Sequence, residues 1–182
     1  YVGRVEESRH AMLTALELCQ RAGDYYGIGN AFNMLYVLVT DIAEAIQYLQ
    51  QASNAFEAAG YIERQVVTIN NSGTLYFSLG LYPRAHRLVS KAVDLNRSMG
   101  AIYMLGGSLS DLVRVEITSG ALDPARAHLQ EMAQLLPTIN APVAPWHLAS
   151  RSGDLALAVG DTKEAVRQFK SAVKNAHQSG TY

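Results

Sequence analysis

The stretch that decides the fold is GTLYFSLGLYPRAHRLVSKA, residues 73–92, because the chain repeats its outline at a fixed interval. Eighty residues later, GDLALAVGDTKEAVRQFKSA at 153–172 has its glycines and its small and large apolar residues at matching places. Three series spaced by 40 residues connect the copies: Gly80, Gly120 and Gly160; Ala45, Ala85, Ala125 and Ala165; and Leu49, Val89, Leu129 and Phe169. Self-similarity at a period of about 20–50 residues is typical of repeat architectures, in which each copy is one small structural unit.

Each copy predicts two helices separated by its central glycine. In the last copy the apolar residues fall at intervals of three, four and seven, as expected for one face of a helix. Asp41 with Glu44, and Asp161 with Glu164, have the spacing of capping boxes, which satisfy free backbone N–H groups at helix starts. The predicted helix stops are Gly60, Gly100, Asn140 and Gly180, residue types that tolerate a left-handed backbone. No window alternates as a half-buried strand does, so we expect an all-α chain.

The copies predict one continuous array of about nine helices. Its parts are the second helix of a truncated repeat at 1–23, repeats at 24–60, 61–100, 101–140 and 141–180, and the start of a further repeat at 181–182. Because the chain begins inside one repeat, without an initiating methionine, and stops as another opens, we expect it to be a fragment of a longer protein. A helix pair cannot bury its apolar stripe alone, so neighbouring repeats must supply a shared core.

These features resemble the tetratricopeptide repeat (TPR), whose pattern has a small residue, a tyrosine, a turn glycine, and then Ala-x3-large-x2-Ala. The clearest copy is Gly73, Tyr76, Gly80, Ala85, Val89 and Ala92. The resemblance covers nearly the whole chain, and the period of 40 exceeds the usual one of about 34 residues, as in variants found in signalling scaffolds and bacterial regulators. The departures are Asn33 and Val113 at the small-residue place, Thr40 for the turn glycine, and Glu116 and Ala156 for the tyrosine.

The resemblance implies a right-handed superhelical solenoid of antiparallel helix pairs, with the first helices on a concave face and the second helices on a convex face. Such a concave groove suits an extended or helical peptide. The residues that we expect to bind the peptide are Asn71, Asn70, Asn30, Thr74, Arg114 and Arg151. A side-chain amide both donates and accepts, which matches a peptide bond, and an arginine fork suits a carboxylate. The alternative is that these residues form an ordinary solvated polar face.

The two arginines also have a structural interpretation. Asp111 and Arg114 are three residues apart, as are Arg151 and Asp154 with the signs reversed. On neighbouring parallel helices, Asp111 would lie beside Arg151, and Arg114 beside Asp154. This square of charges would join the third repeat to the fourth, each pair contributing roughly 0.5 kcal/mol. The asparagines have no comparable partner in the sequence pattern, so we rank them above the arginines as binding residues.

Composition argues against several classes of partner. Of the 182 residues, 49% are hydrophobic and 17% are charged, and the formal net charge is −1 with neither a basic block nor an acidic tail. We therefore expect no binding to nucleic acid or to an anionic membrane by this segment. No apolar run approaches the roughly 20 residues of a membrane span. The single cysteine, Cys19, cannot form an internal disulfide and favours a reducing, cytoplasmic compartment.

The sequence contains no recognisable catalytic or metal-binding motif. The five histidines are His10, His86, His128, His147 and His177. They fall in different repeats or on opposite helix faces, and we interpret His128 with Glu131 as a surface pair. Ser108 lies outside any GxSxG motif, so we interpret it as a small residue at a helix contact rather than a nucleophile. We expect a protein that is not an enzyme and holds neither a cofactor nor a metal.

The function that these features favour is a protein- or peptide-binding scaffold module within a larger signalling or transcription-regulatory protein. One alternative is a sensor of a small metabolite, because the resemblance extends to helical-repeat arms of bacterial ATP-dependent transcription regulators. Another is a purely architectural role, in which the array packs in cis on other domains or forms a homodimer. Low charge favours this role, since weakly solvated surfaces invite association.

Overall fold

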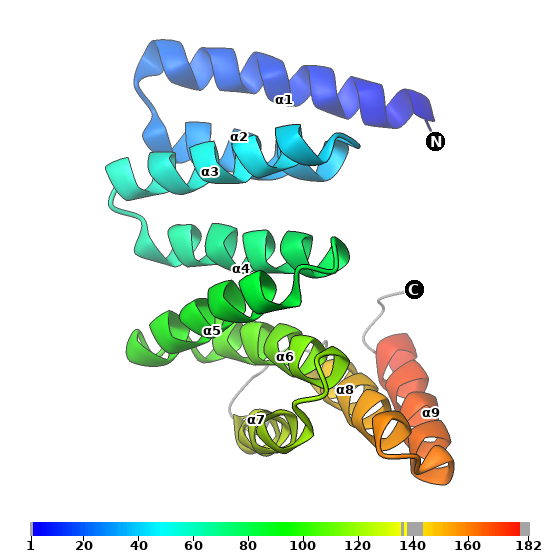
Figure 1. Cartoon of the computed structure of the whole chain (residues 1–182). Coiled ribbons are helices and arrows are strands. Elements are labelled where there is room, and N and C mark those ends of the chain that lie inside the picture. The colour runs from blue at the N-terminus through cyan, green and yellow to red at the C-terminus, as the bar shows by residue number, and fades with distance from the viewer. Residues whose placement is uncertain (1, 136, 138–143, 179–182) are drawn as a thin grey trace. The chain divides into compact units, whose positions relative to one another are not determined.

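The computed structural model describes residues 2–135, 137 and 144–178, and within them the chain forms nine α-helices and no strand (Figure 1). The helices are α1 (Val2–Ala22), α2 (Tyr25–Leu38), α3 (Ile42–Ala58), α4 (Ile62–Ser78), α5 (Tyr82–Ser98), α6 (Ile102–Thr118), α7 (Leu122–Leu135), α8 (Ala144–Ala158) and α9 (Thr162–Gln178). This result confirms the all-α prediction. The predicted stops at Asn140 and Gly180, and the predicted further repeat at 181–182, lie outside the described residues.

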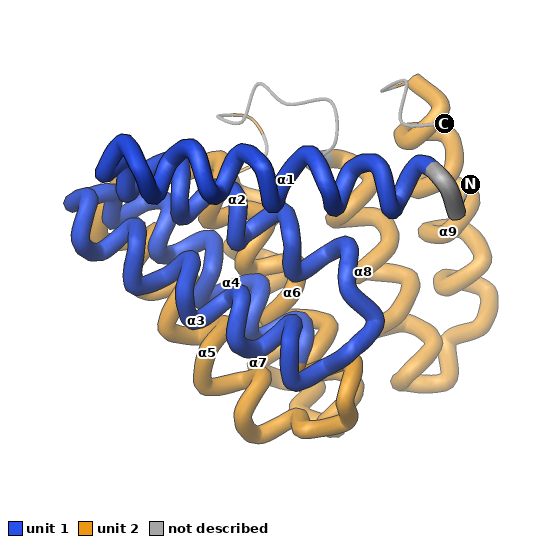
Figure 2. The backbone as a smooth tube through the Cα atoms, turned by 90° about the horizontal axis from the view of Figure 1, so that it is seen from above, with its two compact units in different colours: residues 1–75 blue, residues 76–182 orange. Residues whose placement is uncertain are grey.

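The chain divides into two compact units, residues 1–75 and residues 76–182, with the boundary inside α4 (Figure 2). Within the first unit, α2 packs against both α1 and α3. Within the second unit, α6 packs against α5, α7 and α8, and α8 packs against α7 and α9. A first helix of the repeat pattern, such as α6, is therefore covered by second helices and also contacts the next first helix.

Glycines end the helices where the sequence predicts. Gly60, Gly80, Gly100, Gly120 and Gly160 have φ of 72°, 73°, 65°, 78° and 84°. An L-residue with a Cβ is strained in this left-handed region, so glycine lets the chain reverse between antiparallel helices. Asp41 and Asp161 accept hydrogen bonds from the backbone N–H of Glu44 and Glu164 at 2.8 and 3.0 Å, which confirms the predicted helix starts.

The repeated apolar positions form the core. All four alanines of the Ala45 series are buried, as are Leu49, Val89 and Leu129. In the fourth repeat, a Cβ at Gly153 would lie 2.6 Å from Cε1 of Phe169, so only glycine permits this approach of α8 to α9. In the first repeat the equivalent close approach is at Gly29, where a Cβ would lie 2.6 Å from Cε1 of Phe56. Gly29 is one helical turn before Asn33, the small-residue place in the sequence pattern.

The side-chain amide of Asn96 on α5 donates to the hydroxyl of Ser108 on α6 at 3.0 Å, and both side chains are buried. Ser108 is therefore a helix-contact residue, as the sequence predicts.

Among the helices that the structure describes, none is long and apolar enough to cross a membrane.

Candidate functional site

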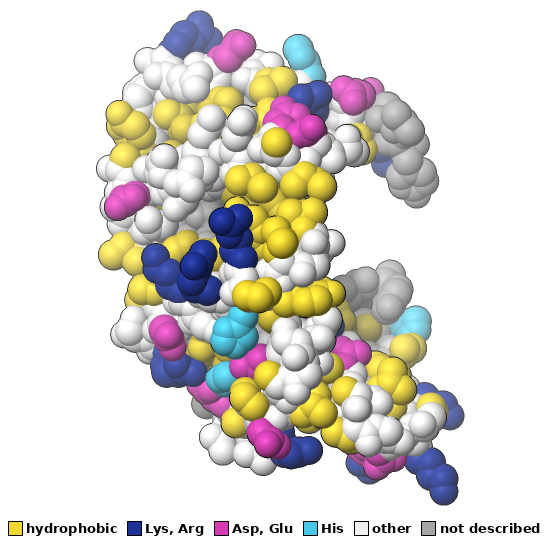
Figure 3. Space-filling model, in the orientation of Figure 1, with side chains coloured by type: hydrophobic (Ala, Val, Ile, Leu, Met, Phe, Trp, Pro, Cys, Tyr) yellow, Lys and Arg dark blue, Asp and Glu magenta, His cyan; other side chains and the backbone are white. Residues whose placement is uncertain are grey.

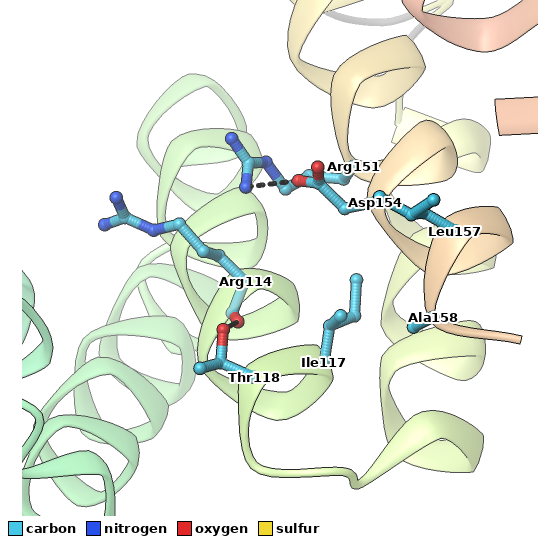
Figure 4. A pocket seen from close by; sticks show the side chains of 7 residues that line it. All are labelled: Arg114, Ile117, Thr118, Arg151, Asp154, Leu157 and Ala158. Carbon is cyan, nitrogen blue, oxygen red and sulfur yellow. Dashed lines mark hydrogen bonds and ion pairs between the residues drawn. The ribbon is translucent and has the colours of Figure 1, made fainter. Parts of the chain in front are cut away.

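A groove runs between α6 and α8, which are the first helices of the third and fourth predicted repeats (Figure 4). Its volume is about 440 Å³, and its lining residues are Arg114, Ile117 and Thr118 of α6 with Arg151, Asp154, Leu157 and Ala158 of α8. We call it the α6–α8 groove. It combines an apolar floor with polar and charged side chains of both signs, and it lies wholly within the second unit.

The α8 side of the groove carries a short ion pair. Nη1 of Arg151 donates to Oδ2 of Asp154 at 2.7 Å, and the two side chains are 17% and 33% exposed. Burial raises the pKa of Asp154, which Arg151 and Arg114 partly offset, and burial also lowers the pKa of Arg151. Both charges are therefore partly removed from water. In such a partly buried environment, electrostatic interactions are stronger than at an open surface.

The α6 side of the groove holds Arg114 by two contacts. Its Nη2 donates to Oδ1 of Asp111 at 3.1 Å, and its Cζ lies 4.4 Å from the ring centre of Phe77 at the end of α4. A guanidinium over an aromatic face gains a cation–π attraction in addition to its ion pair. The Nε–H groups of Arg114 and Arg151 are buried without a hydrogen-bond partner, which is an unfavourable state for a donor.

The predicted square of charges takes a different form in the structure. The ion pairs that the structure forms here join residues three apart on the same helix, Asp111 with Arg114 and Arg151 with Asp154. Between the helices, Asp111 raises the pKa of Arg151, as expected for the predicted neighbours, and Arg114 lowers the pKa of both Arg151 and Asp154. An i,i+3 partner is always within reach on a helix, whereas a partner on another helix depends on the distance between the two axes.

The asparagines predicted to bind a peptide lie in the first unit. Nδ2 of Asn71 on α4 donates to Oδ1 of Asn33 on α2 at 3.0 Å, and the hydroxyl of Thr74 donates to the backbone oxygen of Asn71 at 2.8 Å. Asn30 forms a side-chain hydrogen bond with Tyr26 that lowers the pKa of the tyrosine. Asn70 is half-buried on α4. Asn71 therefore joins two first helices, a contact that the sequence pattern did not indicate.

A second polar cluster, which sequence analysis missed, lies on the other side of α6. The side chain of Glu116 is only 2% exposed, and its two oxygens meet two histidines. Nδ1 of His128 on α7 is 2.9 Å from Oε2, and Nε2 of His86 on α5 is 3.5 Å from Oε1. The interpretation of His128 as the surface partner of Glu131 was therefore wrong, because the helix packing turns its ring toward Glu116.

One signal could have revealed this cluster. Glu116 occupies the place where the first two repeats have Tyr36 and Tyr76, and a carboxylate there must be buried against both neighbouring second helices. Searching those helices for a positive or hydrogen-donating partner would have found His86 and His128. On the face drawn in Figure 3, histidine side chains lie beside acidic ones over α5 and α7. Among the described residues, no group of three or more His, Cys, Asp or Glu side chains could hold a metal ion.

Comparison with known proteins shows the fold. No family model matches the chain, and no curated protein matches it. Among solved structures, BtubC (BKLC) from P. vanneervenii is 13% identical, with a TM-score of 0.63 over 100% of this chain and 90% of that one. TPR-like repeats of a kinesin light chain from Podosopora anserina are 15% identical, with a TM-score of 0.66 over 98% and 89%.

A third solved structure is a signal transduction ATPase with numerous domains (STAND) that has a tetratricopeptide repeat sensor, from Pyrococcus horikoshii. It is 18% identical, with a TM-score of 0.71, and the match covers 98% of this chain and 28% of that protein. At 13–18% sequence identity, these matches show that the backbones share a fold.

Proposed function

We propose that this chain, which has the tetratricopeptide-repeat fold, is a non-enzymatic module that binds a peptide segment of another protein along its first helices. The observation that carries the proposal is the α6–α8 groove, because it is open and lies between consecutive first helices. Its volume of about 440 Å³ falls within the range of about 300–1,000 Å³ usual for ligand sites.

The chemistry of the groove suits a polypeptide better than a free anion. Ile117, Leu157 and Ala158 offer apolar contact, and the side chain of Leu157 is 57% exposed. The flanking ion pairs contain two arginines and two aspartates, so their formal charges cancel. A peptide can place an apolar side chain on the floor of such a groove while its backbone and charged groups contact both signs at the flanks.

The first unit supplies a second proposed contact surface, formed by Asn71, Asn70, Asn30 and Thr74. An amide has two N–H donors and a carbonyl acceptor, so the contact from Asn71 to Asn33 uses one of its two donors. We propose that these amides hydrogen-bond the backbone of a peptide bound to the first unit and, independently, that the arginines of the α6–α8 groove contact carboxylates of a peptide bound to the second unit. The two surfaces are separate contacts, and each is tested by its own variant.

The test selects binders from a displayed random-peptide library on the full 182-residue chain and measures their affinity by calorimetry. Arg151→Gln with Arg114→Gln should weaken selected peptides by about tenfold or more, because charge-assisted hydrogen bonds at a partly buried site are lost. Asn71→Ala should weaken peptides that bind the first unit.

The matched control is Arg167→Gln, because Arg167 also forms an i,i+3 ion pair, with Glu164 on α9, but does not line the groove. Affinity should be unchanged in this variant. Failure to select any peptide, or equal affinities for the wild type and the double arginine variant, would contradict the proposal.

A sensor of a small metabolite is the second candidate. It is favoured by the match to the STAND protein, which has a tetratricopeptide repeat sensor and of which this chain spans 28%. A metabolite that binds the folded chain raises its melting temperature by mass action. A reproducible rise with one compound from a metabolite panel, abolished by the two arginine substitutions, would favour this candidate over the peptide.

A further inference from the structure

The cluster on the far side of α6 from the α6–α8 groove joins three helices through one carboxylate. Glu116 on α6 contacts His128 on α7 at 2.9 Å and His86 on α5 at 3.5 Å. An ionised carboxylate only accepts, so Nδ1 of His128 carries the hydrogen in its contact. Nδ1 of His86 in turn lies 3.4 Å from the hydroxyl of Ser90, one turn further along α5.

The three residues break the repeat pattern together. At the place of Glu116 the other repeats have tyrosine or alanine, and at the places of His86 and His128 none of them has histidine. A buried carboxylate is strongly destabilising without a partner. The two histidines supply that partner from the preceding second helix and from the second helix of the same repeat.

Other charged groups face the cluster from both second helices. Nη2 of Arg97 on α5 donates hydrogen bonds to both carboxylate oxygens of Glu131 on α7, each at 3.1 Å. Arg97 also forms an ion pair with Asp94. Glu131 raises the pKa of His128 and Arg97 lowers it, so their effects oppose each other. On α8, which also packs against α6, His147 interacts with Arg151 and Asp111 instead. Glu116 is therefore the main charged partner of His128.

We propose that His86, Glu116 and His128 form a pH-sensitive clasp that holds the second helices α5 and α7 onto the first helix α6 and tightens in mildly acidic conditions. We call it the histidine clasp. When an imidazole takes up a proton, its contact with the Glu116 carboxylate changes from a hydrogen bond in which only the acceptor is charged to an ion pair in which donor and acceptor carry opposite charges, which is stronger. Histidine is the side chain whose ordinary pKa permits this change near neutral pH.

The direction of the pH effect follows from His128. Its hydrogen bond to Glu116 raises its pKa above the ordinary 6.5, although burial acts the other way. The folded chain thus binds this proton more tightly than the unfolded chain does. The resulting stabilisation is fully present below pH 6.5 and is lost as the pH rises through the raised pKa of His128.

The test compares the full chain with Glu116→Gln from about pH 5.5 to about pH 8.5, following thermal unfolding and the titration of histidine ring protons by NMR. In the wild type, we expect the pKa of His128 to lie above the ordinary histidine value of 6.5. As the pH rises through this pKa, the melting temperature should fall. In Glu116→Gln, the pKa of His128 should be lower than in the wild type. The fall in melting temperature that is due to His128 should then be absent.

Two controls isolate the clasp. Burial lowers the pKa of His147, so His147 contributes an opposite trend, which cancels in the difference between wild type and variant. His128→Gln is a second variant, which serves if Glu116→Gln does not fold. It introduces glutamine, the residue that the fourth repeat has at the equivalent position, Gln168, and it should lose the same pH dependence. Equal pH dependence in wild type and His128→Gln would overturn the proposal, as would a stabilisation that a metal chelator abolishes.

Discussion

The same two register positions carry different chemistry in the two units. In α4 of the first unit they are Asn71 and Thr74, and in α6 and α8 of the second unit they are Asp111 with Arg114 and Arg151 with Asp154. The first unit uses neutral hydrogen bonds there, including the one from Asn71 to Asn33 on α2. The second unit uses ion pairs within each helix.

This difference shows that a repeat constrains the buried face of a helix far more than its groove face. The alanines of the Ala45 series have one size because all four are buried. Groove positions need only a satisfied polar group, which an amide or an ion pair provides equally well. Neutral hydrogen bonds and ion pairs differ in how much stability is lost when one partner is removed and in how they respond to salt.

The largest effect is expected for Asp154→Ala in the second unit. Arg151, only 17% exposed, would then remain partly buried without its partner. Removing one member of a fully buried pair costs about 3–5 kcal/mol, and the partial exposure here reduces the expected loss of unfolding free energy to about 2 kcal/mol. Urea denaturation measures it. Asp123→Ala removes the exposed partner of Arg126 and should cost under about 0.5 kcal/mol. Equal losses in the two variants would show that burial of Arg151 is unimportant.

A smaller effect is expected for Asn71→Ala in the first unit. The variant loses one neutral hydrogen bond to Asn33, worth about 1 kcal/mol of unfolding free energy. A double-mutant cycle with Asn33→Ala measures the coupling between the two side chains. If the losses of the two single variants simply add, the hydrogen bond between α2 and α4 does not contribute to stability.

The smallest effect is the salt response of the Asp111–Arg114 pair. These side chains are 27% and 33% exposed, so we expect a coupling of about 0.5 kcal/mol at low salt. Screening by about 1 M NaCl should reduce it, whereas the coupling between Asn33 and Asn71 should not change. The two cycles, repeated at both salt concentrations, give the comparison directly. A salt-sensitive asparagine cycle would mean that charges elsewhere control the first unit.

Much of the fold could be predicted because its causes are local. A left-handed backbone at Gly60 and an Asp161 cap on α9 depend on a few adjacent residues, and the helical spacing of apolar residues marks the buried face of each helix. The place of Asn33 shows the limit of this reasoning. The repeat pattern marks position 33 as a close approach, but Phe56 meets Gly29 instead, one turn earlier.

The period of 40 residues, the helix ends and the buried alanines were determined by the sequence itself, since backbone geometry and apolar spacing act over one or two turns of chain. Only the tertiary structure decided which polar groups meet. His86 and His128 lie 30 and 12 residues from Glu116 along the chain and meet it only because α5 and α7 both pack on α6. Partner choice between helices depends on the distance between their axes and the rotation of each, which residue spacing within one helix does not specify.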